Sequence, residues 1–482
     1  MKKTVLPIIA LLISCPCFAQ KSPTTKSIDG LKNESATTIQ SSYDDYKKIA
    51  MAIWGYAEVG YKEVKSSTLL QNTLKDNEFT VEAGVAGIPT AFVATYGSGS
   101  PVVGILAEYD ALPGLSQDNS PTKTAIANKN SGHACGHHLF GTGSVAAGIA
   151  LKKLIKEGKI KGTIKVYGCP AEEGGSGKVY MVREGLFNNV DVVIHWHPSD
   201  NNSVMITSAL ANKSAKFRFY GTASHASMSP EKGRSALDAV EGMNYFVNMM
   251  REHIPQETRI HYIITNGGKA PNVVPDFSEV YYYVRHPERA LVESIFNRVV
   301  KAAEGAALGT ESKSDFELIG GTHDLLINKT LATAMQTNLE KVGGVTYTPE
   351  EIAFSKTLRT SFADKAPNVD EAASVKPMHI EKNQGSTDVG DVSYAVPTVG
   401  VEAATWVPGT AAHSWQAVAC GGTDIGVKGM VVAAKAMAFT AIDVFTNPQL
   451  ILKAKEEFLK SRGDYQYKAL LGDRKPALNY RD

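Results

Sequence analysis

One polar loop holds residues of the types that bind metal ions. Cys135 and His137 lie two positions apart in Gly-His-Ala-Cys-Gly-His-His at 132–138. A thiolate and an imidazole on a glycine-rich loop can face one cation. An isolated histidine is more often a hydrogen-bonded structural residue, but three histidines and a cysteine within six residues favour a metal site. We assign His133 and His138 supporting or structural roles.

Two adjacent carboxylates, Glu172 and Glu173, follow an apolar stretch in Pro-Ala-Glu-Glu-Gly-Gly at 170–175. Two exposed acids at the start of a loop would be the simpler interpretation of this pair taken alone. The apolar stretch before them, and a metal loop that needs hard oxygen ligands, favour a chemical role instead. One carboxylate could bind a metal while its neighbour takes a proton from metal-bound water.

Further histidines and acids extend this candidate set. His195 and His197 are two apart in Val-Ile-His-Trp-His-Pro, so they lie on one face of a predicted strand. His413 lies in a loop of small residues and, taken alone, could equally be a structural residue. Together with Glu108 and Asp110, which end an earlier apolar run, these residues provide what two adjacent divalent ions need.

Apolar runs that end at these polar clusters predict the strands that position them. The runs at 102–107, 164–168 and 190–194 indicate buried strands of an α/β sheet. Helices of small residues lie between them, of which 141–155 is the clearest. Because open α/β sheets bind ligands at the carboxyl ends of their strands, we expect all three clusters at one site.

The middle of the chain has a different pattern from about Ser214 onward. Strand, helix, strand, strand, helix and strand are expected in turn at 215–220, 235–251, 259–265, 279–284, 290–307 and 314–319. This order is that of a ferredoxin-like α+β unit. The chain then returns to α/β patterning, with an apolar run at 396–401 and a long alanine-rich helix at 426–444. We therefore expect an α/β catalytic domain, with a mixed sheet flanked by helices, and a smaller domain inserted in its middle.

The expected boundaries follow from these patterns. A signal peptide occupies 1–19, a flexible leader 20–40, the first part of the catalytic domain 41–213, the inserted domain 214–322, and the rest of the catalytic domain with a C-terminal tail 323–482.

The first residues have the pattern of an export signal. Lys2 and Lys3 precede an apolar run at 4–14 that is too short to span a bilayer. Small residues before Gln20 favour cleavage at that point, which would place the protein in the periplasm or outside the cell. An alternative is lipoprotein processing at Leu-Ile-Ser-Cys, which would leave Cys15 as a lipid-carrying N-terminus.

Composition and charge exclude several classes of protein. With 482 residues, 43% hydrophobic and 21% charged, the chain can bury a large core, which excludes disorder and small disulfide scaffolds. Lys and Arg number 50 against 49 Asp and Glu, so no charge pattern indicates binding to nucleic acid or to an anionic membrane. We expect a small-molecule partner.

Cysteines 135, 169 and 420 are an odd number set far apart, which offers no disulfide framework and leaves one free for metal ligation.

Eight motifs, in order along the chain, resemble those of one known family. They are Ala-Glu-Tyr-Asp-Ala-Leu-Pro at 107–113, His-Ala-Cys-Gly-His-His at 133–138, Pro-Ala-Glu-Glu-Gly-Gly at 170–175, Trp-His-Pro at 196–198, Gly-Thr-Ala-Ser-His-Ala at 221–226, Asn-Val-Val-Pro-Asp at 272–276, Gly-Ser-Thr-Asp-Val-Gly-Asp at 385–391 and His-Ser-Trp at 413–415. The set resembles the co-catalytic metal aminoacylase and carboxypeptidase superfamily, in its amidohydrolase branch. Within it, the likeness is greatest to the p-aminobenzoyl-glutamate hydrolase subunits.

The resemblance implies roles for individual residues. Two divalent ions, manganese or zinc, would be held by Cys135, His137, Glu173, His197 and His413. Glu172 would be the general base. His225 in the inserted domain would reach the neighbouring subunit's site and stabilise the oxyanion. Substrate would be held by Asn272, Arg285, Ser386 and Thr387, although Arg285 could instead be a surface arginine on an exposed strand face.

The sequence departs from the family pattern at two positions near the metals. Peptidase relatives have His-x-Asp where this chain has Glu108-Tyr109-Asp110, and many amidohydrolases have Asp where it has His138. Both departures leave the ligand set of the second metal open.

The resemblance implies metal-dependent hydrolysis of the amide bond of N-acyl amino acids such as p-aminobenzoyl-glutamate. An exported dipeptidase of the same fold is the alternative. A non-catalytic metal-binding protein is disfavoured, because Glu172 and all five proposed ligands are present. The expected assembly is a homodimer, with a related second subunit as a further possibility, and without nucleic acid or a membrane span.

Overall fold

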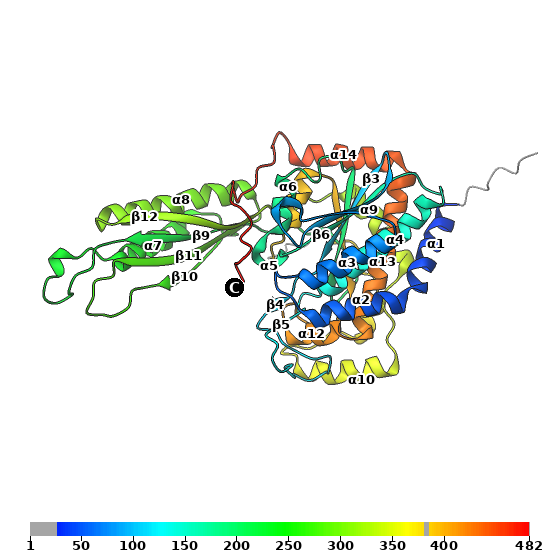
Figure 1. Ribbon diagram of the computed structural model, residues 1–482, viewed down its shortest axis with the longest axis horizontal. Coiled ribbons are helices and arrows are strands. Elements are labelled where there is room, and N and C mark those ends of the chain that lie inside the picture. The colour runs from blue at the N-terminus through cyan, green and yellow to red at the C-terminus, as the bar shows by residue number, and fades with distance from the viewer. Residues whose placement is uncertain (1–26, 380–384, 482) are drawn as a thin grey trace, which may run out of the picture.

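The computed structural model describes residues 27–379 and 385–481. The predicted signal peptide and the alternative lipid site at Cys15 lie outside the described residues. The chain forms a large α/β body and a narrower projection, residues 211–322, that we call the arm (Figure 1).

A seven-stranded mixed sheet forms the centre of the large body. Its strand order is β1-β2-β6-β3-β7-β13-β8. The strands are β1 (Thr80–Ala83), β2 (Phe92–Ser98), β6 (Gly162–Cys169), β3 (Val102–Glu108), β7 (Val192–Ser199), β13 (Thr398–Ala404) and β8 (Ser203–Met205). The four central strands β6, β3, β7 and β13 run parallel. The predicted apolar runs at 102–107 and 164–168 lie within β3 and β6, and the run at 190–194 overlaps the start of β7. Because these three strands are parallel, their carboxyl ends share one edge of the sheet.

Helices cover this sheet. The central ones are α4 (His137–Lys156) and α13 (Asp424–Thr446), which pack against each other and against the sheet. By length and composition α13, with a mean hydropathy of 1.6, could cross a membrane, but 89% of that stretch is buried inside the protein, as in a core helix. The small residues of α4 permit this close packing, since a Cβ added at Gly143 would lie 3.0 Å from Met430 Cγ.

The other helices of the large body lie around this core or beside the site. They are α1 (Ile28–Ser41), α2 (Tyr43–Tyr56), α3 (Val64–Asp76), α5 (Glu172–Gly175), α6 (Gly177–Arg183), α9 (Lys329–Val342), α10 (Pro349–Leu358), α11 (Val389–Ala395), α12 (Trp415–Gly421) and α14 (Pro448–Arg462). A two-stranded ribbon joins β4 (Leu112–Pro113) to β5 (Ser131–Gly132).

The predicted flexible leader over 20–40 is wrong from Ile28 onward, where α1 begins. The side chain of Ser27 accepts a hydrogen bond from the Gly30 amide and caps this helix. Leu31 and Ile39 are buried on the face that packs against α4 and α13. The polar composition of the segment conceals this apolar stripe, which is why composition alone predicts a leader.

The arm has a hydrophobic core of its own. Its elements are β9 (Ala211–Tyr220), α7 (Ala236–Met250), β10 (Arg259–Asn266), β11 (Phe277–His286), α8 (Arg289–Gly309) and β12 (Lys313–Thr322). The strands form an antiparallel sheet of order β10-β11-β9-β12. Along β11 buried and half-buried residues alternate, because α7 and α8 cover one face of the sheet. The observed elements match the six predicted from the sequence to within a few residues.

Candidate metal centre

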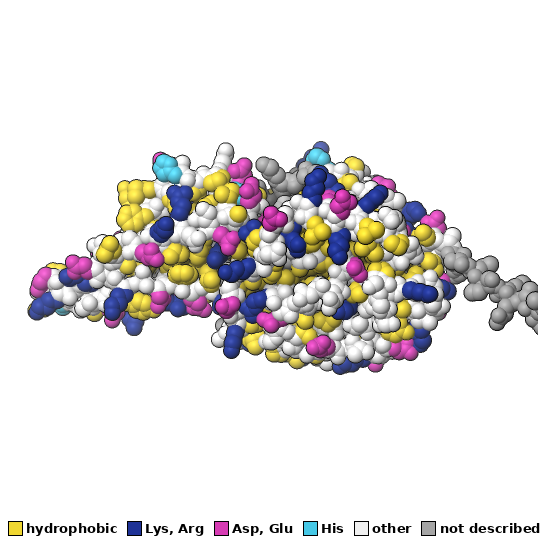
Figure 2. Space-filling model, turned by 90° about the horizontal axis from the view of Figure 1, so that it is seen from above, with side chains coloured by type: hydrophobic (Ala, Val, Ile, Leu, Met, Phe, Trp, Pro, Cys, Tyr) yellow, Lys and Arg dark blue, Asp and Glu magenta, His cyan; other side chains and the backbone are white. Residues whose placement is uncertain are grey.

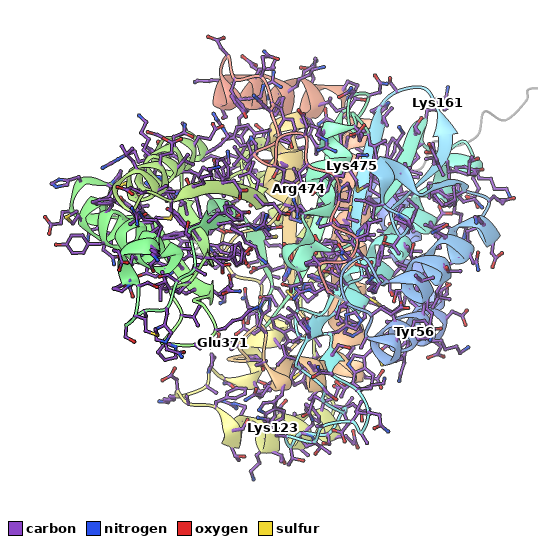
Figure 3. All side chains as sticks on the ribbon, turned by 60° about the vertical axis from the view of Figure 1, so that its left-hand side comes forward. Tyr56, Lys123, Lys161, Glu371, Arg474 and Lys475 are labelled. Carbon is purple, nitrogen blue, oxygen red and sulfur yellow. The ribbon has the colours of Figure 1, made fainter. Side chains whose placement is uncertain are left out.

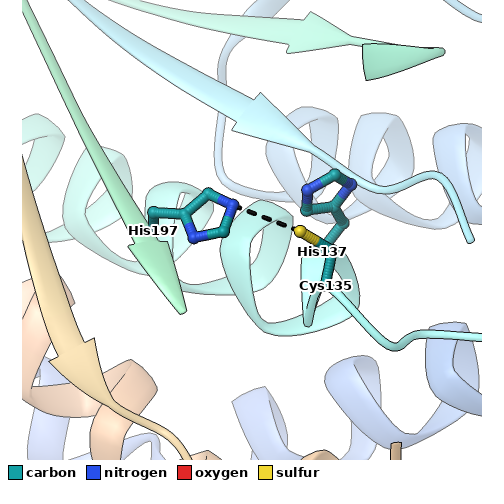
Figure 4. Close-up of side chains that lie close together, drawn as sticks. All are labelled: Cys135, His137 and His197. Atoms are coloured by element: carbon teal, nitrogen blue, oxygen red, sulfur yellow. Dashed lines mark hydrogen bonds between the residues drawn. The ribbon is translucent and has the colours of Figure 1, made fainter. Parts of the chain in front are cut away.

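The five predicted metal ligands come together beside the carboxyl ends of β3, β6 and β7. Cys135 Sγ lies 3.3 Å from His197 Nε2, with His137 alongside (Figure 4). His413 Nε2 lies 3.1 Å from Glu173 Oε1. Donor atoms lie within 4.8 Å of one another in three overlapping groups, which are Cys135–His137–His197, Cys135–Glu173–His413 and Glu108–His137–Glu172.

Local backbone geometry turns the loop ligands inward. Gly136, between Cys135 and His137, has a φ of +76°, and an added Cβ there would lie 2.6 Å from Pro198 Cβ. Only glycine fits this position without a shift of the neighbouring chain. The His413 amide donates a 3.0 Å hydrogen bond to Ala134 O, which joins the late loop to the cysteine loop.

Buried polar atoms at the centre fit a cation. Among the described residues, Glu108 Oε2, His137 Nε2 and Glu173 Oε1 are buried without a hydrogen bond. His137 Nε2 and Glu108 Oε2 lie only 3.1 Å apart. Buried polar groups are normally paired, and a divalent ion between these atoms would satisfy all three. With a thiol, three imidazoles and carboxylates as donors, the residues present fit a metal centre.

Asp110 orients two of the candidate ligands. Its Oδ1 lies 2.9 Å from His137 Nδ1, and its Oδ2 accepts a 2.9 Å hydrogen bond from the Glu173 amide. When the Nδ1–H of His137 donates a hydrogen bond to Asp110, Nε2 is left as the atom that can bind a metal. The sequence analysis placed Asp110 among the residues that two ions need. In the structure it contacts the Nδ1 side of the His137 imidazole and so supports a candidate ligand.

The surrounding charges shift several pKa values. Burial alone would lower the pKa of His137, but the thiol of Cys135 and the carboxylates of Asp110 and Glu108 raise it well above its usual value. Burial also raises the pKa of the Cys135 thiol. The negative potential that favours a proton on His137 equally favours a divalent cation, whose charge would deprotonate the thiol.

The two adjacent glutamates have pKa values shifted in opposite directions. Burial, together with Glu108 and Glu173, raises the pKa of Glu172 well above its usual value. Burial would also raise the pKa of Glu173, but the close contact with His413 and the charge of His137 bring it below its usual value. Opposite shifts in two adjacent carboxyl groups are expected where one takes part in proton transfer and the other binds a metal.

A buried lysine that the sequence analysis missed connects two parts of the site. Lys178 Nζ lies 2.6 Å from Glu108 Oε1 and 2.6 Å from Asp388 Oδ1. Burial alone would lower its pKa, but Asp388 and Glu108 raise it well above the usual value. Lys178 therefore stays charged and offsets the acids around it. The available signal was its position directly before the apolar residues 179–182, which places it on a buried helix.

The sequence analysis also missed Glu63, which holds the start of the loop at 171–176 that carries Glu172 and Glu173. Ala171 has a φ of +56°, and its amide donates a 2.8 Å hydrogen bond to Glu63 Oε1. Burial and the nearby Asp110 raise the pKa of Glu63 to about 8. Nothing in the sequence around Glu63 marks this contact, because its partner lies 108 positions away.

The remaining histidines of the two motifs have structural partners. His133 Nε2 lies 3.1 Å from Ile53 O, and His138 Nε2 lies 2.9 Å from Gly421 O. Burial lowers the pKa of both, to about 3 for His138. Burial likewise lowers the pKa of His195 to about 3. These side chains are buried as neutral groups.

The predicted residues of the arm do not meet the metal ligands within this chain. His225 and Asn272 are both exposed and lie together, since His225 bridges Val273 and Asn272 O accepts the Ala226 amide. Both belong to loops at the end of the sheet where Phe277 pairs with Tyr220, far from the large body.

Arg285 lies at the other end of the arm sheet, paired with Asn212. Phe277 and Arg285 are eight residues apart on β11, which corresponds to ~26 Å at ~3.3 Å per residue. Within one protomer, therefore, Arg285 and Asn272 lie at opposite ends of the arm. Ser386 and Thr387 precede Asp388, which contacts Lys178 beside the cluster.

Comparison with known proteins gives this cluster a context. Residues 104–438 match the family described as peptidase family M20/M25/M40. The chain belongs to this family. It is 40% identical over 446 residues to one p-aminobenzoyl-glutamate hydrolase subunit of Escherichia coli, covering 87% of this chain and 93% of that protein. It is 30% identical over 445 residues to the Xaa-Arg dipeptidase of Mus musculus, covering 89% and 92%.

Solved structures of family M20 and of related proteins share the fold. A dinuclear metal-binding M20 peptidase from Bacillus subtilis has a TM-score of 0.59 at 16% identity, covering 84% of this chain and 99% of that one. An aminobenzoyl-glutamate utilization protein from Klebsiella pneumoniae has a TM-score of 0.57 at 17% identity, covering 87% and 98%. The family match and the similarity to hydrolases over most of the chain show that this protein is a hydrolase that acts on amide or peptide bonds.

Proposed function

We propose that this chain hydrolyses the amide bond of N-acyl amino acids such as p-aminobenzoyl-glutamate, with two divalent metal ions, manganese or zinc, as cofactors. The observation that carries the proposal is the convergence of all five candidate ligands around buried atoms without hydrogen bonds. Similarity along 93% of a p-aminobenzoyl-glutamate hydrolase subunit supports the substrate class.

Glu172 supplies the acid–base chemistry in this proposal. When bound, the ions would lower the pKa of water and polarise the amide carbonyl. Glu172 takes the proton of the attacking water and returns it to the leaving amine. Its carboxyl group lies in the same cluster as Glu108 and His137, so it faces the place where the water must lie.

The donor set leaves zinc and manganese as the two candidates. The thiol of Cys135 and the imidazoles of His137, His197 and His413 suit zinc, whereas additional carboxylates suit manganese. Glu173 with Glu108 or Glu172 provides such oxygen donors.

We also propose that the arm is a ferredoxin-like dimerisation domain, with boundaries near 214 and 322, that completes the partner's site. Its strand β9 alone has ten residues, so the loop with His225 lies ~30 Å beyond the root of the arm. Such a loop acts on another protomer more readily than on its own. In a dimer, Arg285 of one chain and Asn272 with His225 of its partner would bind one substrate, with Arg285 holding its carboxylate.

The free edge of the arm supports this assembly. Strand β10 ends the sheet, and its residues Ile263 and Ile264 are 62% and 44% exposed. Tyr245 and Met249 are exposed on α7, and hydrophobic side chains lie at several places on the surface of the arm (Figure 2). An apolar edge strand is a template for pairing with another chain. A second copy of this chain is the proposed occupant. A related protein is the alternative, since the relatives in Escherichia coli include another p-aminobenzoyl-glutamate hydrolase subunit, 28% identical over 319 residues.

A dipeptidase is the second candidate function, because Xaa-Arg dipeptidases are relatives at 29–30% identity. Hydrolysis rates of the metal-loaded protein on p-aminobenzoyl-glutamate, other acyl-glutamates and Xaa-Arg dipeptides distinguish these two functions. We expect the acyl-glutamates to be cleaved faster. Preference for a free α-amine would favour the dipeptidase, and no hydrolysis of either class would contradict the proposed function.

Export to the periplasm, with or without a lipid at Cys15, is part of the proposal. Fractionation of expressing cells and the mass of the mature N-terminus test it. Cleavage before Gln20 is expected, and a cytoplasmic, uncleaved protein would contradict it.

A further inference from the structure

The segment that follows α14 links the arm, the large body and the loop at 171–176. Residues 463–481 contain no helix or strand. The red end of the chain runs from α14 past the junction with the arm toward α5 (Figure 1). Ala469, Leu470 and Leu471 are 7%, 3% and 1% exposed, so the middle of the segment is packed into the protein.

The first half of this segment is fixed at the junction. Tyr467 donates a 2.8 Å hydrogen bond to Asp391 Oδ1. Leu470 lies against the end of β12, where a Cβ added at Gly321 would be 2.9 Å from Leu470 Cβ. Arg474, labelled in Figure 3, donates to Ile319 O of the arm at 3.2 Å. The segment is thus attached on both sides of the junction.

The last described residues contact the loop that carries Glu172 and Glu173. The Tyr480 hydroxyl donates to Glu173 O at 3.0 Å, and Arg481 Nη2 donates to the same oxygen at 2.6 Å. The Tyr480 ring packs edge-on against Tyr61 at 5.5 Å. Tyr61 in turn donates a 2.7 Å hydrogen bond to Gly175 O.

This loop needs outside support to keep its shape. Ala171, Gly174 and Ser176 have φ values of +56°, +88° and +59°. Non-glycine residues in the left-handed region persist where surrounding contacts fix them. Glu63 and Asp110 hold the loop through the amides of Ala171 and Glu173, whereas residues 480 and 481 hold it through the Glu173 carbonyl.

We propose that residues 463–481 form a strap that fixes the loop at 171–176, and that Tyr480 and Arg481 are positioning residues for Glu173. Two hydrogen bonds to the carbonyl of Glu173 restrict rotation of its backbone and keep its carboxylate directed at His413. The inference rests on the proposed function only in taking Glu173 as a metal ligand. Outer partners of this kind typically change metal affinity by ~10–100-fold when removed.

The double variant Tyr480→Phe/Arg481→Ala tests this proposal. It removes both hydrogen bonds while the phenyl ring keeps its contact with Tyr61. Titration of the metal-depleted protein with Zn²⁺ or Mn²⁺ should show ~10–100-fold weaker binding. Amide hydrogen exchange over 171–176, measured without metal, should become faster. In turnover of acyl-glutamates we expect kcat to fall at limiting metal, with KM nearly unchanged.

Two further variants serve as controls. Lys475→Ala changes an exposed side chain of the same segment (Figure 3). Among the described residues its hydrogen-bond partner is Tyr180, which donates to the backbone carbonyl and not to the side chain. It should bind metal as the parent does. Arg481→Lys keeps a cationic donor and should retain most of the parent's metal affinity and loop protection.

The readouts separate failure of this proposal from failure of the proposed function. Lower thermal stability of the double variant, with parental metal affinity and parental exchange over 171–176, would reduce the segment to a structural role and overturn the proposal. Metal affinity and exchange need no substrate. A parent protein that binds metal but cleaves no acyl amino acid would therefore overturn the function and leave the strap testable.

Discussion

The metal cluster and the far end of the arm differ in how complete they are within one chain. Every candidate ligand, Glu172 and the supporting Asp110 and Lys178 converge in the large body. His225 and Asn272, by contrast, are exposed on loops that contact none of these residues, among the contacts within the described chain. The candidate metal cluster is therefore assembled within a single chain, whereas the roles proposed above for His225 and Asn272 depend on a partner chain.

The largest expected effect is on the general base. Glu172→Gln should leave metal content nearly unchanged and lower the hydrolysis rate by at least ~100-fold, because the amide cannot accept the proton of water. Metal analysis and steady-state rates check this. If the variant instead loses its metal, Glu172 is a ligand and the roles of the two adjacent glutamates are reversed.

The buried ion pair of the cluster should matter for stability far more than an ion pair on the arm. Lys178→Met leaves Glu108 and Asp388 as uncompensated buried charges, so the free energy of unfolding should fall by ~3–5 kcal/mol. The matched control is Lys216→Met on the arm, whose ion pair with Glu279 is partly exposed and should contribute less than ~1 kcal/mol.

Denaturant unfolding of the metal-depleted proteins measures both changes. Equal effects of Lys178→Met and Lys216→Met would remove Lys178 from the account of the site.

On the arm, His225→Ala should lower kcat by ~100-fold while KM changes little, because its imidazole donates to charge that develops only in the transition state. Metal content should equal that of the parent, since the cluster is complete without the arm. A raised KM with parental kcat would instead assign His225 to substrate binding.

The smallest of these effects concerns a single ligand. Cys135→Ser replaces a soft thiolate by a hydroxyl, a poor ligand at neutral pH, and should weaken metal affinity by more than ~10-fold, the lower end of the range for loss of an outer partner. Competition with a metal-binding dye measures this affinity. Parental affinity and activity would exclude Cys135 from the centre.

The sequence predicts the strands and the cluster well because both follow from local patterns. Apolar runs ending in polar residues locate β3, β6 and β7, and parallel strands necessarily bring their ends to one edge. Histidine and cysteine spacing then points to Cys135, His137 and His197, whereas Glu173 and His413 complete the candidate set only through the family resemblance.

The residues missed by the sequence analysis act over long separations. Glu63 meets Ala171 across 108 positions, and Tyr480 meets Glu173 across 307. No local pattern marks such contacts, because they depend on how loops pack after the sheet has formed. The helix α1 was missed for a different reason, since its polar composition conceals a buried face.

Exchange of protomers between Glu172→Gln and His225→Ala proteins tests most directly whether the site is shared between chains. Each protein alone should be nearly inactive. In a mixed dimer, one of the two sites has an intact Glu172 and the partner's intact His225, so random exchange of equal amounts should restore roughly one quarter of the parental activity. This recovery should require Zn²⁺ or Mn²⁺. No recovery despite demonstrated mixed dimers would contradict the shared site and confine His225 to its own chain or to the fold.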